Sequence, residues 1–285
     1  MKKLTRVIRN IAQHWVGDGF PVRSLFSYGG DNEFDPFLLL DYAGPHEFAP
    51  SPGKRGVDVH PHKGFETVTI LYQGELAHRD SSGGKGQLGP GDVQWMTAGN
   101  GIVHEEFHSE EFTRSGGLLE MVQLWVNLRA KDKSTPAKYQ DLRDAQFPRV
   151  SLPSDAGEVR VIAGDFDGTS GAASTFTYIN VWDLQLTVES TAALTVPSGH
   201  TCILLVQHGN LLANGNELKA VELALFERDG IAITLQTSVA SRLLVLTGEP
   251  LDEPLVGHGP FVMNTREEIR QAIRDFQSGK MGVLK

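Results

Sequence analysis

Short apolar or alternating runs recur along this chain between clusters of Gly, Pro, Asp and Asn, and this rhythm limits what the chain can fold into. Runs of about four to eight residues with a period of two are typical of β-strands, and closely spaced turn residues are typical of antiparallel connections. Helical periodicity is scarce. The sequence therefore predicts an all-β protein made of sandwiches or barrels.

The expected strands form two groups, separated by a charged and proline-rich connection at Arg129–Val150. In the first group we expect strands at Phe37–Asp41, Val57–His60, Glu66–Gln73, Glu75–Asp80, Asp92–Met96, Gly101–His108 and Leu118–Leu128. In the second group we expect strands at Val159–Ala163, Tyr178–Leu186, Ala192–Val196, Thr201–His208, Asn210–Ala213, Leu223–Phe226, Ile231–Gln236 and Ser241–Thr247.

The length of 285 residues suits two domains of ordinary size, each able to bury its own core. We place the first domain at residues 1–135 and the second at residues 136–285. Near the C-terminus, four apolar residues at helical spacing predict a helix at Thr265–Gln277, with Asn264 or Thr265 as its cap and acidic residues in its first turn. This helix is expected to pack across a sheet.

Composition excludes several classes of function. The chain has 26 basic and 35 acidic residues, and a formal net charge of −9 disfavours a protein built to bind the nucleic-acid backbone. Its single cysteine, Cys202, cannot form an internal disulfide, which fits a reducing compartment. The N-terminus lacks the apolar region of a signal peptide, and no stretch reaches the roughly 18 apolar residues of a membrane span. We therefore expect a cytoplasmic protein without a membrane partner.

Two short motifs place three imidazoles and a carboxylate on predicted strands. They are His60-Pro61-His62 and His104-Glu105-Glu106. Residues i and i+2 of a strand point to the same face, so His60 and His62 can converge on one ion, as can His104 and Glu106. A mixed set of nitrogen and oxygen donors suits a divalent first-row metal better than magnesium or calcium. Iron, copper, manganese, cobalt and nickel all fit this description, and the residues alone do not choose among them.

At these motifs the sequence resembles the pirin family of the cupin superfamily. The resemblance is carried by Asp35–Asp41, Val59–Thr69, Gly89–Glu106, Gly248–Leu251 and Gly259–Thr265, and it extends along most of the chain.

The resemblance implies two cupin-type β-barrels, a metal in the N-terminal barrel held by His60, His62, His104 and Glu106, and a C-terminal barrel that has lost the site. The sequence supports that loss independently, because residues 151–250 hold only two histidines and no His-x-His pair.

Other residues compete for places at the site. Many metal cupins take their carboxylate from a position a few residues beyond His-x-His, here Glu66, but the pirin pattern and strand spacing favour Glu106. Glu105 should point away and be structural. His108 continues the parity of His104, although we expect it on a solvated strand. The remaining polar candidates are surface or outer residues around the ligands: His46, His78, Asp58, Asp92, Gln94 and Gln123.

Three functions fit these features. Pirins are similar to flavonol dioxygenases, so the resemblance implies cleavage of a quercetin-like substrate with O2, with Glu106 acting both as ligand and as proton acceptor. A second hypothesis is a regulatory module whose metal state alters a surface for a transcription factor or a metabolic enzyme, since some pirins act in this way. The third is another metal-dependent enzyme, such as an isomerase or a decarboxylase.

Overall fold

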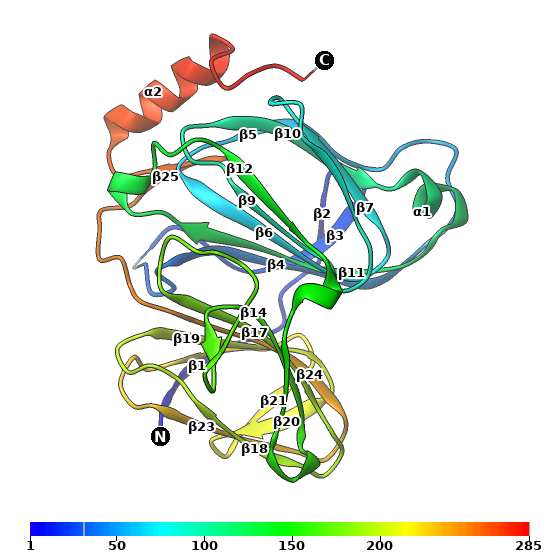
Figure 1. Ribbon diagram of the computed structural model, residues 1–285, viewed down its shortest axis with the longest axis vertical. Helices are drawn as coiled ribbons and strands as arrows, with labels where there is room; N and C mark the ends of the chain where they lie inside the picture. Colours follow the sequence, from blue (N-terminus) through cyan, green and yellow to red (C-terminus); the bar gives the residue numbers. More distant parts are fainter. Residues whose placement is uncertain (31, 285) are drawn as a thin grey trace. The chain divides into compact units, whose positions relative to one another are not determined.

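A computed structural model describes residues 1–30 and 32–284, and β-strands dominate this part of the chain (Figure 1). The predicted all-β fold is confirmed: the chain folds into two cupin-type β-barrels and carries a short C-terminal helix. Each of the strands expected from the sequence overlaps a strand of the structure. Within residues 1–30 and 32–284, neither helix has the length and apolar character that a membrane-spanning helix needs.

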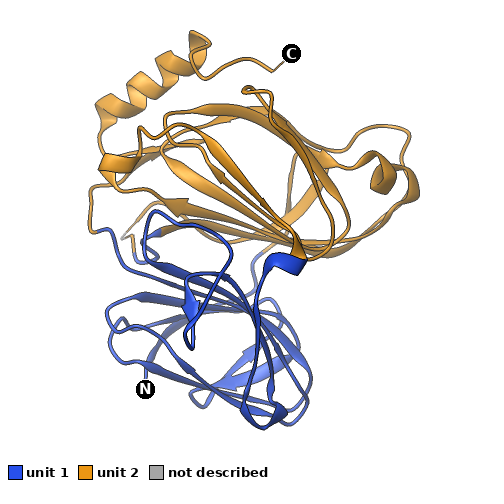
Figure 2. Cartoon of the chain, in the orientation of Figure 1, with its two compact units in different colours: residues 1–11, 33–36, 145–251 blue, residues 12–32, 37–144, 252–285 orange. Residues whose placement is uncertain are grey.

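The chain divides into two compact units that each take segments from several parts of the sequence (Figure 2). Unit 1 comprises residues 1–11, 33–36 and 145–251, and unit 2 comprises residues 12–32, 37–144 and 252–285. The sequence instead predicts a single boundary, between residues 135 and 136, and places the C-terminal helix in the second domain. The helix packs within unit 2, among residues of the first barrel.

Unit 2 contains a seven-stranded and a four-stranded antiparallel sheet. The seven-stranded sheet has the order β12 (Lys138–Leu142), β9 (Val93–Thr97), β6 (Phe65–Gln73), β11 (Gly117–Asn127), β4 (Phe37–Phe48), β3 (Phe20–Ser27) and β2 (His14–Val16). The four-stranded sheet has the order β5 (Gly56–His62), β10 (Ile102–His108), β7 (Leu76–Asp80) and β8 (Lys85–Leu88).

Burial explains why the centre of the larger sheet is so rich in apolar residues. Every residue of β6 except Gln73 is buried, as expected for a strand that has neighbours on both sides and is covered on both faces. The smaller sheet is less uniform, because β5 is exposed at Asp58 and Val59 and becomes buried only at Pro61 and His62. The end of β5 that carries the histidines is therefore the enclosed end.

Unit 1 is also built from two larger antiparallel sheets. The first has the order β1 (Leu4–Ile8), β22 (Leu223–Phe226), β19 (Thr201–His208), β24 (Ser241–Gly248), β17 (Ile179–Leu186), β14 (Gly157–Ala163) and β13 (Arg149–Ser151). The second has the order β18 (Thr191–Thr195), β23 (Ala232–Thr237), β20 (Asn210–Ala213) and β21 (Asn216–Lys219). A two-stranded ribbon is formed by β15 (Asp165–Phe166) and β16 (Thr169–Ser170).

Helical segments are few and short. The helix α1 (Glu110–Ser115) follows β10, and the helix α2 (Arg266–Gln277) follows the ribbon of β25 (Val256–His258) and β26 (Phe261–Met263). Thr265 caps α2 and forms a reciprocal capping box with Glu268, which satisfies two amides that the first turn leaves free. In the described part of the chain, 3-10 turns lie at Ala130–Asp132, Asp144–Gln146 and Pro153–Asp155.

Candidate metal centre

Two neighbouring strands of unit 2 carry the predicted ligands. In the antiparallel pair of β5 and β10, His60 lies directly opposite His104, and His62 lies opposite Ile102. Directly opposed residues of an antiparallel pair project to the same side of the sheet, and His62 joins them because it is two residues from His60. The register therefore places all three imidazoles on one face.

The three imidazoles form a compact triangle. One nitrogen from each of the three rings lies within 4.8 Å of the others. The ring centroids are 4.4 Å apart for His60 and His104, 4.8 Å for His60 and His62, and 4.9 Å for His62 and His104. Nitrogens that bind one ion tetrahedrally at about 2.1 Å each are about 3.4 Å apart. A contraction of the triangle by up to about 1.4 Å, which side-chain rotation can supply, would bring the three nitrogens onto one ion.

The free ring nitrogens suit a metal. The Nδ1 atom of His60 is 2.7 Å from the carbonyl oxygen of Asp58. A carbonyl can only accept a hydrogen bond, so Nδ1 carries the proton and Nε2 keeps its lone pair. Among the described residues, Nδ1 of His62 and both ring nitrogens of His104 are buried without a hydrogen-bond partner. Buried polar atoms of this kind are costly unless something binds them.

Electrostatics keeps two of these rings neutral. Burial, together with the neighbouring histidines, holds the pKa of both His62 and His104 well below the ordinary value of 6.5. The carbonyl of Pro260 opposes this shift of the His62 pKa without reversing it. A neutral imidazole has a lone pair to give to a metal, so at neutral pH the cluster is ready to bind a cation.

Glu106 lies two residues beyond His104 on β10 and is partly buried. Its Oε1 atom is 3.5 Å from the hydroxyl of Thr69, which donates a shorter hydrogen bond of 2.8 Å to Gln123. Burial raises the pKa of Glu106, while His60 and His78 act in the opposite direction. The carboxylate is thus close enough to His60 to interact with it electrostatically, and its role as fourth ligand stays a prediction.

The competing carboxylates have other partners. Oε1 of Glu66 accepts a hydrogen bond of 2.7 Å from Thr97, and burial raises the pKa of Glu66 to about 7. The charged side chains that act on the pKa of Glu66 are Lys138, which lowers it, and Asp132, which raises it. Glu105 pairs with Lys54 and Arg79 on the opposite face of β10, in agreement with strand alternation. These contacts favour Glu106 over Glu66 as the carboxylate nearest the histidines.

The position expected for His108 from the sequence is wrong. It does not lie on a solvated strand: its side chain is buried, and its Nε2 atom is 2.9 Å from the carbonyl oxygen of Gly19. Edge-to-face contacts with Phe20, Phe48 and Phe112 complete its surroundings. Since a ring with these partners is satisfied within an aromatic cluster, His108 is a core residue.

Beside the histidine cluster, further polar side chains bridge the two sheets of unit 2. His78 is buried, lies opposite Glu106 in the β7–β10 pair, and stacks on Tyr139 with ring centroids 5.2 Å apart. Its Nε2 atom is 3.5 Å from Asp141, which also accepts a hydrogen bond of 3.1 Å from Gln94. The sequence leaves His78 either at the surface or beside the metal ligands, and its burial excludes the surface position.

The outer residues suggested by the sequence divide into two groups. Asp58 supports His60 through its carbonyl oxygen, and Gln123 lies next to Glu106 through Thr69. Asp92 instead binds Arg143 and the backbone of Gly89, and it belongs to a turn. Thr69 was missed, although an uncharged polar residue in the middle of a fully buried strand was an available signal.

Comparison with known proteins identifies the family. The model of the Pirin family matches residues 19–126, and that of the pirin C-terminal cupin domain matches residues 181–282. A relative from Pseudomonas aeruginosa, provisionally named as a quercetin 2,3-dioxygenase, is 55% identical over 98% of each chain. Human pirin is 37% identical and covers 99% of this chain and 94% of its own. The chain belongs to the pirin family.

A solved structure supports the same assignment. The crystal structure of a quercetin 2,3-dioxygenase from Acinetobacter baumannii covers 100% of both chains with a TM-score of 0.97 and 50% sequence identity. For this chain, the similarity in sequence and structure establishes the pirin family and the cupin fold.

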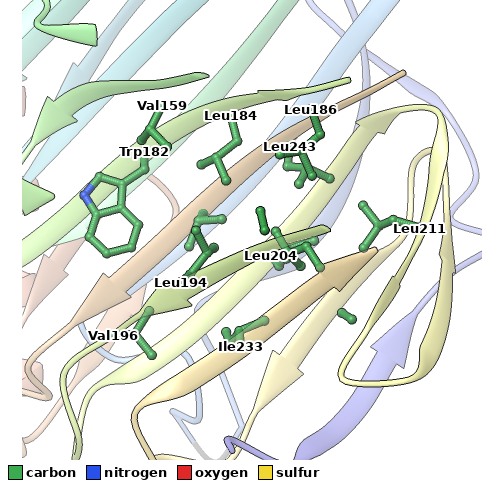
Figure 3. Close-up of a cluster of buried hydrophobic side chains, with 14 of the residues drawn as sticks. Val159, Trp182, Leu184, Leu186, Leu194, Val196, Leu204, Leu211, Ile233 and Leu243 are labelled. Carbon is green, nitrogen blue, oxygen red and sulfur yellow. The ribbon is translucent and has the colours of Figure 1, made fainter. Parts of the chain in front are cut away.

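The two barrels of this pirin have different interiors. Unit 1 is filled by a large apolar cluster that includes Trp182, Leu184, Leu204 and Leu243 (Figure 3). Within residues 1–30 and 32–284, the only group of three or more potential metal ligands is the histidine cluster of unit 2. A packed apolar interior offers a cation no donors, so the chemistry of this pirin is expected in unit 2.

Aromatic side chains border the histidine cluster on one side. The ring centroid of Trp125 is 5.3 Å from that of His62 and 4.3 Å from that of Phe65, and Tyr28 stacks on Trp125 at 6.2 Å. Tyr28 and Trp125 are only partly buried. The cluster therefore has a flat apolar wall beside it, part of which solvent can reach.

Proposed function

We propose that this pirin is a metal-dependent dioxygenase that uses O2 to cleave a planar, hydroxylated aromatic substrate of the flavonol class. The observation that carries the proposal is the convergence of three imidazoles, two of which, His62 and His104, have buried nitrogens without a hydrogen-bond partner among the described residues. His60, His62 and His104 would hold the ion, with Glu106 as fourth ligand. The preferred ion is Fe(II), and copper, manganese, cobalt and nickel are alternatives.

The bound metal would supply open coordination positions and the redox chemistry that a reaction with O2 requires. The protein contributes the placement of donors and protons. Asp58 fixes the tautomer of His60, and burial keeps His62 and His104 neutral. These features prepare the site before substrate binds, so little reorganisation accompanies binding.

Glu106 is the proposed proton acceptor. A flavonol must lose the proton of its hydroxyl group to bind as an anion, and a carboxylate with a raised pKa is a better base than an exposed one. Burial provides that raised pKa, and the hydroxyl of Thr69 lies beside Oε1. We propose that Glu106 receives this proton on a carboxylate oxygen.

The aromatic wall supports the choice of substrate class. Trp125 and Phe65 pack against His62 at distances suited to ring contacts. A planar aromatic molecule that stacks on the partly exposed ring of Trp125 gains about 0.5–1.5 kcal/mol beyond the burial of its area. The same wall would orient the rings of the substrate toward the imidazoles.

Oxygen uptake tests the proposal. Purified protein loaded with Fe(II) or copper is mixed with quercetin in an oxygen electrode, with and without air. We expect metal-dependent oxygen consumption that falls by at least about 100-fold in His62→Ala, because a ligand is lost. The matched control is His46→Ala, because the ring of His46 packs against Trp15 and Phe48 and is not part of the histidine cluster.

Two outcomes would contradict the proposal. One is the absence of oxygen uptake with every metal, and the other is equal activity of His62→Ala and the wild type. Conversion of quercetin in the absence of air would instead favour an isomerase or decarboxylase on the same scaffold.

A further inference from the structure

The C-terminal segment of unit 2 contacts both strands that carry the histidines. We call residues 260–284 the C-terminal clamp. It includes β26 and α2, of which α2 is labelled in Figure 1. Its apolar side forms a cluster with Val103, the residue before His104, through Phe261, Met263, Ile269 and Met281. The clamp is thus attached to the outer face of the ligand strands.

The first attachment follows His62 directly. The amide of Lys63 donates to the carbonyl oxygen of Pro260 at 3.2 Å, and the amide of Val262 donates to the carbonyl oxygen of Lys63 at 3.0 Å. Gly64 makes this approach possible: it has a φ of +90°, and a Cβ atom there would lie 2.0 Å from the carbonyl oxygen of Val262. The chain beyond His62 is fixed by the clamp.

An ion pair reinforces this attachment. Nζ of Lys63 is 3.1 Å from Oδ2 of Asp275 on α2 and donates a hydrogen bond of 2.8 Å to the carbonyl oxygen of Asn100. Both partners are largely shielded, with side-chain exposures of 14% and 13%. Gln271 donates to the other oxygen of Asp275 at 2.7 Å. A shielded and hydrogen-bonded pair holds its geometry more firmly than an exposed one.

The second attachment lies next to His104. The hydroxyl of Ser81 donates to the carbonyl oxygen of Met281 at 2.7 Å and accepts the amide of Val103 at 3.2 Å. The amide of Ser81 donates in turn to the carbonyl oxygen of Val103 at 2.8 Å. The end of the clamp is therefore connected to the backbone one residue before a ligand.

We propose that the C-terminal clamp positions the metal centre, with the Lys63–Asp275 pair setting the place of His62 and the Ser81–Met281 contact setting that of His104. This inference rests on the proposed metal site. Lys63, Ser81 and Asp275 are positioning residues, because each acts on a ligand through the backbone. Loosening either attachment widens the triangle of nitrogens, which already needs to contract to bind one ion.

Co²⁺ is the probe for the test, because its visible absorption reports the geometry of its ligands as well as its affinity. The full-length protein and three variants are titrated against a competing chelator: Asp275→Ala, Ser81→Ala and the conservative Asp275→Glu. We expect about tenfold weaker Co²⁺ binding and an altered spectrum in the first two, as for other residues that support ligands. Asp275→Glu should recover most of the affinity.

The matched control is Glu267→Gln on the same helix. Glu267 is 68% exposed, and its ion pairs are with Arg270 and Arg274 of α2 itself. We expect its affinity and spectrum to equal those of the wild type. Unchanged affinity and spectrum in both Asp275→Ala and Ser81→Ala would overturn the clamp. Equal losses in Asp275→Ala and Glu267→Gln would also overturn it, whereas a wild type that binds no Co²⁺ would refute the metal site itself.

Discussion

Replacing His104 by leucine is expected to stabilise the metal-free protein. His104 is only 1% exposed, and both of its ring nitrogens are buried without a hydrogen-bond partner among the described residues. A buried polar group without a partner costs about 1–3 kcal/mol. Leucine has a similar volume and no polar atom, so His104→Leu should raise the free energy of unfolding by about 1–3 kcal/mol. Most core substitutions have the opposite sign.

Bound metal should make the wild type more stable than His104→Leu. A ligand present at a thousand times its dissociation constant stabilises a folded protein by about 4 kcal/mol. The wild type should gain this amount, and His104→Leu, with one of three imidazoles missing, should gain far less. Urea denaturation of both proteins, with and without Co²⁺, measures the two differences. A metal-free variant that is less stable than the wild type, or an unchanged response to Co²⁺, would show that His104 is an ordinary satisfied core residue.

Three further changes test other parts of the structure. The pKa of His104 lies below 6.5 in the folded chain, so below that pH the unfolded chain binds the extra proton and stability falls by up to about 1.4 kcal/mol per pH unit. The stability advantage of metal-free His104→Leu should therefore grow as denaturation is measured at lower pH, and parallel profiles would contradict the assigned burial. The pKa of Glu66 is raised from 4.5 to about 7, so ionising Glu66 removes stability as the pH rises through this range. Urea denaturation should show Glu66→Gln about 3 kcal/mol more stable than the wild type at alkaline pH and similar to it in acid, and no difference at alkaline pH would refute this. His108→Ala should lower the free energy of unfolding by about 2–4 kcal/mol, because the aromatic contacts and the hydrogen bond to Gly19 are lost. The affinity for Co²⁺ should not change. Weaker Co²⁺ binding would show that His108 contributes to the metal centre.

Local sequence patterns predict much of the fold and the position of the histidines. Alternation of apolar residues and turn residues locates the central strands, because each of them is buried on at least one face. The positions of the histidines are predictable for a related reason. Side chains of a strand alternate between its two faces, so His60 and His62 lie on the same side of β5 regardless of the neighbouring strands.

Contacts between distant parts of the chain are what the sequence does not reveal. The strand β1 pairs with β22, more than 200 residues away, and carries no local sign of its partner. The strand β12 falls within the segment that the sequence predicts as a connection, because that segment is rich in charge and proline and three of the five residues of β12 are charged or amide residues. His108 finds its acceptor at Gly19, 89 residues away, so its parity on β10 was misleading about its surroundings.

The position of one metal ion tests the central claim most directly. Crystals grown with Co²⁺ or Fe(II) are measured at the absorption edge of that metal. We expect a single anomalous peak in unit 2, about 2.0–2.2 Å from one nitrogen each of His60, His62 and His104. A peak elsewhere, or three imidazoles without a peak between them in the presence of the metal, would contradict the assignment of this cluster as the metal centre.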